Sequence, residues 1–373
     1  MMRQETEKII TRAPGRVCLF GEHQDYLDLP VIAAAIDRYV EFSAVENNAR
    51  TFRFTMPDIS EDRVIDIGDS FEKLLPRDYL GSVLKIAGDY GCQPDRGLDI
   101  EISGNIPINA GASSSTALTV AWANLLLRSF GADQEITPGF LAKAAHRAEV
   151  VEHQEPGGMM DHLTICHGNV LLIDAQNGYS ITVLSKNLEG LILADSGIPK
   201  KTLNILSDVK QNVLAAIKML EKQLPGFRLA NITPDELPSC LKILPEKLAP
   251  YFVAAVLNHD YTKKALRIFN QPQPDSAWFG ELMNRHHNVL KNHLKITVPK
   301  IDQMVKTALA AGAFGAKING SGGGGTIVIL APGNERQVIE ALREIDATAY
   351  SVCVDSGAKV VYHPQTLTTN KAS

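Results

Sequence analysis

Cysteine is scarce in this chain of 373 residues. Its five cysteines are odd in number, scattered along the chain and never spaced as Cys-x-x-Cys. This distribution argues against a disulfide framework and against a cysteine-based zinc site. Free cysteine behaves as a small hydrophobe, and a reducing cytoplasm is the simplest compartment for unpaired thiols. We therefore expect all of them in or near the core: Cys18, Cys92, Cys166, Cys240 and Cys353.

Long apolar runs and an excess of positive charge are also missing. No apolar run approaches the roughly 18 residues that a membrane helix requires, and residues 1–8 are too charged for a signal peptide. The formal net charge is −5 and the lysines and arginines are dispersed, so there is no basic patch for a nucleic-acid backbone. These absences predict a cytoplasmic protein with no membrane or nucleic-acid partner, whose ligands are small molecules.

The chain does have the length and the apolar content for two domains. At 373 residues and 45% hydrophobic content it exceeds the usual size of a single core. Strand-like and helical runs alternate in the first part and helices dominate the middle, which predicts a mixed α and β protein with a domain change between residues 174 and 199. The expected strands are 52–56, 97–102, 169–173, 326–330 and 349–354, and the expected helices are 71–90, 114–130, 138–152, 200–222, 298–311 and 335–345.

The most informative stretch is residues 107–117, Pro-Ile-Asn-Ala-Gly-Ala-Ser-Ser-Ser-Thr-Ala. It places small residues and three serines directly before an apolar helical pattern that Gly131 ends. The first turn of a helix leaves backbone N–H groups unpaired and carries partial positive charge, so such a loop can hold a phosphate. The alternative is an ordinary serine N-cap on a buried helix.

Two familiar phosphate-binding loops can be rejected. No Gly-Lys-Ser/Thr follows a glycine loop, so there is no Walker A loop. Residues 320–325 match Gly-x-Gly-x-x-Gly, but a strand-like run at 326–330 follows, whereas a dinucleotide fingerprint opens a helix. The glycines still permit close approach of another backbone or a ligand. The alternative is a flexible hairpin or a sheet-packing loop.

Three polar side chains crowd together after Gly21, namely Glu22, His23 and Asp25. Ionised carboxylates are strong hydrogen-bond acceptors and imidazole can donate, so the cluster suits a ligand with several hydroxyls, such as a sugar. A solvated surface loop is the alternative. A metal site is less well supported, because no second histidine lies nearby at ligand spacing.

A second pair of carboxylates lies farther along the chain. Glu149 falls near the end of a helical pattern, and Asp161 follows a Pro-Gly-Gly turn. A carboxylate at Asp161 can accept or orient the proton of an attacking hydroxyl, and Glu149 can offer an oxygen ligand to magnesium. Either residue taken alone is an ordinary surface acid.

Three segments taken together resemble the signature segments of the GHMP kinases, the superfamily of galactokinase, homoserine kinase, mevalonate kinase and phosphomevalonate kinase. They are residues 16–26, 107–116 and 317–325, in the order and spacing of that family. The pattern Gly-Arg-Val-x-Leu-x-Gly-Glu-His-x-Asp-Tyr from Gly15, and Gly-Met-Met-Asp ending at Asp161, are most similar to galactokinase. Further matches lie before the last glycine loop, at His287, Leu290, Pro299 and Asp302.

The resemblance implies an α+β, two-domain GHMP kinase fold. It would comprise an N-terminal mixed α/β domain over residues 1–190 and a C-terminal ferredoxin-like α+β domain over residues 191–373, with the active site in the cleft between them. It further implies an ATP-dependent sugar kinase that uses Mg²⁺ and phosphorylates the anomeric hydroxyl of galactose or a related monosaccharide. We expect it to act as a monomer.

The resemblance also assigns roles residue by residue. Asp161 takes the catalytic aspartate role, with Arg16 as the cation that keeps it ionised. Ser115 and Glu149 become magnesium ligands. The remaining positions are Glu22, His23 and Asp25 for the sugar, and Gly111, Ala112, Ser113, Ser114 and Ser115 for the ATP phosphates.

This sequence departs from galactokinases in ways that bear on the substrate. Residues 27–33 read Leu-Asp-Leu-Pro-Val-Ile-Ala where Asn-Gly-Gly-Phe-Val-Leu-Pro is usual. The phosphate loop differs at Asn109, Ala110, Ala112 and Thr116, and no counterpart of the family's sugar-contacting tyrosine is found. A uronic acid, arabinose or fucose is therefore an alternative to galactose. A mevalonate-type kinase and a catalytically silent sugar and ATP sensor are the alternatives in activity.

Overall fold

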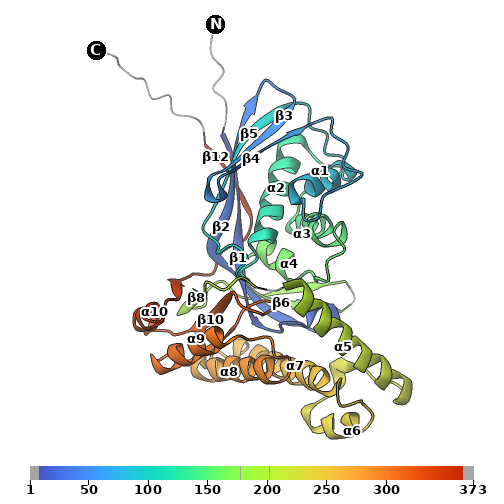
Figure 1. Cartoon of the computed structure of the whole chain (residues 1–373), viewed down its shortest axis with the longest axis vertical. Helices are drawn as coiled ribbons and strands as arrows, with labels where there is room; N and C mark the ends of the chain where they lie inside the picture. The colour runs from blue at the N-terminus through green and yellow to red at the C-terminus, as the bar shows by residue number, and fades with distance from the viewer. Residues whose placement is uncertain (1–7, 177, 201, 364–373) are drawn as a thin grey trace.

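The computed structural model describes residues 8–176, 178–200 and 202–363, and they form two sheets that share a core (Figure 1). The first sheet has the order β12-β1-β2-β5-β3-β4, with β6 paired to β2 and β7 to β6. All its pairs are antiparallel except β3 with β5. Its strands are β1 (Lys8–Phe20), β2 (Val31–Asn47), β3 (Thr51–Met56), β4 (Glu61–Asp66), β5 (Gly97–Gly104), β6 (Val170–Asp174), β7 (Ser180–Ser185) and β12 (Lys359–His363).

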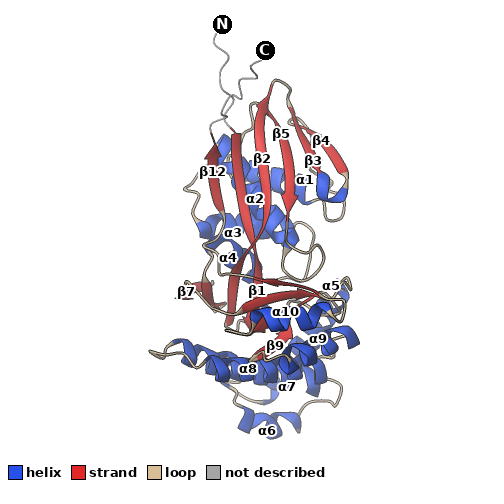
Figure 2. Ribbon diagram, turned by 90° about the vertical axis from the view of Figure 1, so that its left-hand side faces the viewer, coloured by secondary structure: helices blue, strands red, loops and turns tan. Residues whose placement is uncertain are grey.

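Helices cover one face of this sheet (Figures 1 and 2). They are α1 (Tyr79–Asp89), α2 (Ser114–Phe130), α3 (Pro138–His146) and α4 (Met160–His167). The fully buried Trp122 of α2 packs against Phe42, Phe52 and Phe54 of the strands, with ring centroids 5.2–5.7 Å apart. The apolar face that the sequence placed after the serines is therefore the face that meets the sheet.

Two predicted helices differ from the structure by more than two residues at one end. The helix expected at 71–90 begins only at Tyr79, because Pro76 disfavours helix in the residue before it and the Asp78 side chain caps the backbone N–H of Gly81. The helix expected at 138–152 ends at His146 and continues as a π-helical turn over Arg147–Val151. The two longest strands of the first sheet, β1 and β2, were not predicted as strands at all.

The second sheet has four antiparallel strands in the order β11-β8-β10-β9. The strands are β8 (Leu191–Asp195), β9 (Gly315–Ile318), β10 (Thr326–Leu330) and β11 (Thr348–Ser351). Numbered along the chain the order is 4-1-3-2, the ferredoxin-like arrangement that was expected. The helices of this part are α5 (Thr202–Gln223), α6 (Leu237–Leu241), α7 (Ala249–Phe269), α8 (Ser276–Asn292), α9 (Pro299–Ala310) and α10 (Glu335–Arg343). Short 3-10 helices lie at Asp25–Leu27, Pro57–Ile59, Leu229–Asn231 and Pro234–Glu236.

The last described strand returns to the first sheet. Val354 bridges Ile36, the Asp355 N–H donates to the Ala35 carbonyl at 2.9 Å, and β12 pairs with β1. Although the C-terminal unit was expected over residues 191–373, β12 is thus a strand of the first sheet. This pairing involves residues more than 300 positions apart and has no local signal.

Four of the five cysteines are buried as expected, but Cys353 is exposed because it lies where the chain leaves the second sheet for the first. Among the described residues, no helix combines the length and apolarity needed to cross a bilayer.

Candidate active site

One cleft collects most of the residues that the sequence singled out. Its walls come from the end of β1, the turn after it, the start of α2, the π-helical turn, the first turn of α4 and the loops after β8 and β9. The predicted residues that line it are Arg16, Glu22, His23, Asp25, Ser113, Ser115, Glu149 and Asp161. Gly111, Ala112 and Ser114 do not line it, although Gly111 and Ala112 contact Arg16 from behind.

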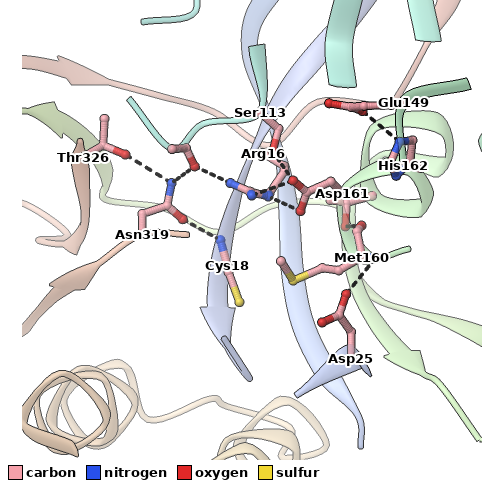
Figure 3. Close-up of polar contacts among 12 residues, drawn as sticks. Arg16, Cys18, Asp25, Ser113, Glu149, Met160, Asp161, His162, Asn319 and Thr326 are labelled. Carbon is pink, nitrogen blue, oxygen red and sulfur yellow. Dashed lines mark hydrogen bonds and ion pairs between the residues drawn. The ribbon is translucent and has the colours of Figure 1, made fainter. Parts of the chain in front are cut away.

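Arg16 and Asp161 form a two-pronged ion pair at the centre of this cleft (Figure 3). Arg16 Nε donates to Asp161 Oδ1 at 2.8 Å and Nη2 donates to Oδ2 at 2.7 Å. The Ser113 hydroxyl also donates to Oδ2, and this serine, which precedes α2 at its N-cap position, does not cap the helix through its side chain. Burial alone would raise the pKa of Asp161, but the charge and hydrogen bonds of Arg16 and the bond from Ser113 lower it to about 2. Asp161 is therefore ionised at neutral pH.

The three sequence motifs meet through Asn319. Its Nδ2 donates to the Gly111 carbonyl at 3.0 Å, and its Oδ1 accepts from the Cys18 N–H at 2.9 Å (Figure 3). The Arg16 N–H donates to the Ala112 carbonyl at 3.2 Å. The end of β1, the serine loop and the strand before the glycine run are thus one hydrogen-bonded unit.

The glycines allow these loops to touch backbone to backbone. Gly111 has φ of +90°, and a Cβ there would lie 2.7 Å from the Asn319 carbonyl oxygen. A Cβ on Gly325 would lie 2.4 Å from the carbonyl oxygen of Ala110. The glycine run, which connects the antiparallel strands β9 and β10, therefore packs closely against the serine loop, as the alternative of a sheet-packing loop also expected.

Glu149 lies in the π-helical turn behind the start of α2, and its side chain forms part of the cleft wall. Only 5% of the residue is exposed. Burial alone would raise its pKa, but hydrogen bonds from His162, Ser115 and Thr116 lower it, so Glu149 is ionised. A hydroxyl and a carboxylate oxygen are ligands that Mg²⁺ prefers, so the Ser115 and Glu149 pair fits this ion. No group of three His, Cys, Asp or Glu in the described ranges forms a metal centre of the protein's own.

The acidic cluster in the turn after β1 divides into different roles. Glu22 is 2% exposed and forms a buried ion pair with Lys317, which leaves Oε2 without a hydrogen-bond partner in the described structure. Asp25 accepts from the Tyr26 N–H at 3.0 Å, and burial together with the charge of Asp161 raises its pKa to about 6. A Cβ on Gly158 would lie 2.0 Å from Asp25 Oδ2, so only glycine fits beside it.

His23 is held as a neutral imidazole. Its Nδ1 lies 2.9 Å from the Tyr26 hydroxyl and its Nε2 lies 3.3 Å from the Ser321 carbonyl oxygen. The carbonyl can only accept, so Nε2 carries the proton and Nδ1 accepts from the tyrosine. Burial lowers the pKa of His23 to about 4. The ring therefore links the turn after β1 to the glycine run.

Sequence reasoning missed several residues that line or support the cleft. Lys317 is fully buried, and a lysine inside a buried strand is a signal that it has a partner. Lys200 lines the cleft, and burial and the nearby Arg16 lower its pKa. Arg77 lies in the cleft wall and donates to Glu155 at 3.0 Å.

Comparison with known proteins agrees with this arrangement. Residues 78–169 match the GHMP kinases N terminal domain, residues 263–347 match GHMP kinases C terminal, and residues 2–44 match the galactokinase galactose-binding signature. A galactokinase of Roseiflexus sp. is 31% identical, over 92% of this chain and 87% of that protein. A mevalonate kinase of Methanothermobacter thermautotrophicus is 30% identical, over 88% of this chain and 92% of its own length.

Solved structures share the fold. Lactococcus lactis galactokinase complexed with galactose superposes with a TM-score of 0.82 at 22% identity, over 94% of this chain and 95% of that chain. The mevalonate kinase of Methanococcus jannaschii superposes with a TM-score of 0.69 at 22% identity, over 92% and 97%. With its two-domain fold, its matched signatures and a relative that is alike over nearly its whole length, the chain belongs to the GHMP kinase family.

Proposed function

We propose that this protein is an ATP-dependent kinase that phosphorylates the anomeric hydroxyl of galactose or a closely related monosaccharide. The observation that carries the proposal is the Arg16–Asp161 pair, which lies in one cleft with the serine loop and with Asp25. Phosphoryl transfer depends mainly on alignment and charge stabilisation, and these are what this arrangement provides.

Asp161 would orient the attacking sugar hydroxyl. With a pKa of about 2 it is ionised at neutral pH but a weak base, so it accepts the proton only as the new bond between the sugar oxygen and the γ-phosphorus forms. The bond to the β-phosphate oxygen breaks in the same step, and ADP leaves. Arg16 would stabilise both the carboxylate and the phosphoryl group in transfer.

Ser115 and Glu149 would hold the Mg²⁺ that accompanies ATP. When bound, the ion neutralises phosphate charge. The chain's own contribution is a carboxylate kept ionised by its hydrogen bonds, beside a hydroxyl on the first turn of α2. That first turn also offers free backbone N–H groups to the phosphates.

Asp25, Glu22 and His23 would bind the sugar. The unpartnered Glu22 Oε2 is a buried acceptor that gains a partner from a ligand hydroxyl. Asp25 lies close enough to Asp161 for their charges to interact, which supports a role for Asp25 in holding a sugar hydroxyl near the one that reacts. A monosaccharide supplies this number of hydroxyls.

A mevalonate-type activity is the second candidate, because mevalonate kinases at 25–30% identity also match over about nine-tenths of the chain. Mevalonate is a mostly apolar acid with one reactive hydroxyl, so it would offer few hydrogen-bond partners to the polar side chains of the turn after β1. A silent sensor is the third candidate. The complete Arg16–Asp161 and Ser115–Glu149 sets favour catalysis over sensing.

The test is to incubate the purified protein with MgATP and a panel of galactose, arabinose, fucose, a uronic acid and mevalonate. ADP release identifies the substrate and phosphorus NMR locates the new phosphate. We expect a sugar 1-phosphate. ADP release with mevalonate and with none of the sugars would refute the sugar assignment, and ATP binding without turnover would indicate a sensor.

A further inference from the structure

His162 is a buried residue that the proposed mechanism does not use. It follows Asp161 directly in the first turn of α4, is 2% exposed, and reaches the cleft wall. Its Nε2 lies 2.9 Å from Glu149 Oε2, the contact drawn in Figure 3. One helical turn therefore carries both the proposed catalytic carboxylate and a side chain that binds the proposed metal ligand.

The surroundings of the ring determine which nitrogen carries the proton. Both ring nitrogens are buried and neither makes a hydrogen bond of regular geometry in the described structure, but Nε2 lies 2.9 Å from a carboxylate oxygen of Glu149. A hydrogen on Nε2 can interact with the Glu149 carboxylate, whereas Nδ1 has no partner in the described structure. We therefore expect the ring to carry hydrogen on Nε2.

The ring is also fixed by packing. The His146 ring of α3 meets it edge to face, with centroids 5.1 Å apart and planes at 84°. The Thr119 hydroxyl lies 3.5 Å from Glu149 Oε2 and also bonds to the Thr116 carbonyl at 2.9 Å. His162 therefore approaches that oxygen more closely than Thr119 does.

We propose that His162 is a positioning residue that holds the Glu149 carboxylate in the orientation that receives Mg²⁺. This inference rests on the proposed function, because it takes Glu149 as a ligand of the ATP-bound metal. A carboxylate that is already oriented binds a metal more tightly than one that is free to rotate, and loss of such outer contacts typically weakens metal binding by about 10- to 100-fold. His162 contacts neither Asp25 nor Glu22, so sugar affinity is not expected to change.

The experiment compares His162→Met with His162→Gln. Both replacements are unbranched and close in length, but only glutamine keeps an N–H donor. His167→Met is the matched control, because His167 lies in the last turn of the same helix. Calorimetry measures ATP binding with Mg²⁺ and with EDTA, without any sugar.

We expect His162→Met to weaken MgATP binding about 10-fold or more and to leave metal-free ATP binding unchanged. His162→Gln and His167→Met should stay close to the wild type. Equal MgATP affinity in His162→Met, or equal weakening with and without Mg²⁺, would overturn the inference. A sugar panel with no product, together with these binding differences, would refute the proposed substrate and leave the inference standing.

A measurement on the unmodified protein decides the matter even where His162→Met does not fold. Long-range proton–nitrogen NMR of histidine side chains distinguishes the two neutral forms, and the spectrum of His162→Gln identifies the His162 signals. Hydrogen on Nε2 is the expected result. Hydrogen on Nδ1 would overturn the inference, because Nε2 would then have nothing to donate to Glu149.

Discussion

Replacing Asp161 with asparagine removes the charge from the centre of the cleft and keeps the shape of the side chain. Arg16 is 4% exposed and would then be a buried cation without a full counter-charge. We expect Asp161→Asn to fold and bind sugar, since Asp25 and Glu22 are unchanged. We expect kcat to fall by about 10²- to 10⁴-fold, the usual contribution of a positioned proton acceptor.

The cost in stability follows from the pKa of Asp161. The folded protein lowers it from 3.8 to about 2, and each pKa unit corresponds to about 1.4 kcal/mol, so the ionised carboxylate stabilises the fold by about 2 kcal/mol at pH 7. Because the pKa is depressed, this contribution is complete above about pH 4 and is lost as the pH falls towards 2. The asparagine variant should show neither the contribution nor its loss.

Urea denaturation at pH 7 and at intervals down to pH 2 measures both effects. Glu41→Gln is the matched control, because Arg12 of the same strand binds Glu41 through Nε and Nη2 at 2.9 and 2.6 Å but is 38% exposed. Such an exposed pair contributes at most about 1 kcal/mol. Equal destabilisation by the two substitutions, or near-normal turnover in Asp161→Asn, would refute the reasoning.

Three further substitutions test other parts of the cleft. The folded protein raises the pKa of Asp25 from 3.8 to about 6, so its ionised form opposes folding above that pH. Asp25→Asn should therefore raise the free energy of unfolding at pH 8 by about 2 to 3 kcal/mol and abolish sugar binding. An unchanged sugar affinity in calorimetry would show that Asp25 is not part of the sugar site. Gly111→Ala should lower the free energy of unfolding by roughly 2 kcal/mol more than Gly131→Ala. Both glycines have positive φ, but a Cβ at Gly111 would meet the Asn319 carbonyl oxygen, whereas nothing lies within 4 Å of a Cβ at Gly131. Equal losses in urea denaturation would show that close packing of the loop is unimportant. Lys200→Met should lower kcat by roughly 100-fold with little change in melting temperature, because Lys200 lines the cleft near Asp161. A normal kcat would show that Lys200 takes no part in phosphoryl transfer.

Local patterns predicted the central helix well. The apolar period of residues 114–130, bounded by serines and Gly131, matches α2 residue for residue. The helix expected at 71–90 was too long because apolar residues of the preceding loop imitate a helical face. Pro76 and the cap at Asp78 are the physical reasons why the helix begins later.

Partners that are distant in sequence had no comparable signal. Glu22 was predicted as a sugar ligand, but its pairing with Lys317, 295 residues away, could not be foreseen. The contact between Glu149 and His162 was not foreseen either, because the two residues belong to different helical elements joined by a Pro-Gly-Gly turn. Resemblance to a family located the motif residues, and it did not indicate which side chains hold them in place.

The residues alone determined which chemical groups are available: an arginine, two acids, a serine loop before a helix, and glycines where loops touch. These depend on residue type and short spacing, which act through local backbone preference. The tertiary structure decided which groups meet and how they are charged. A pKa of about 2 at Asp161 and of about 6 at Asp25 arises from burial and from neighbours on other elements, and such contacts exist only after the chain has folded.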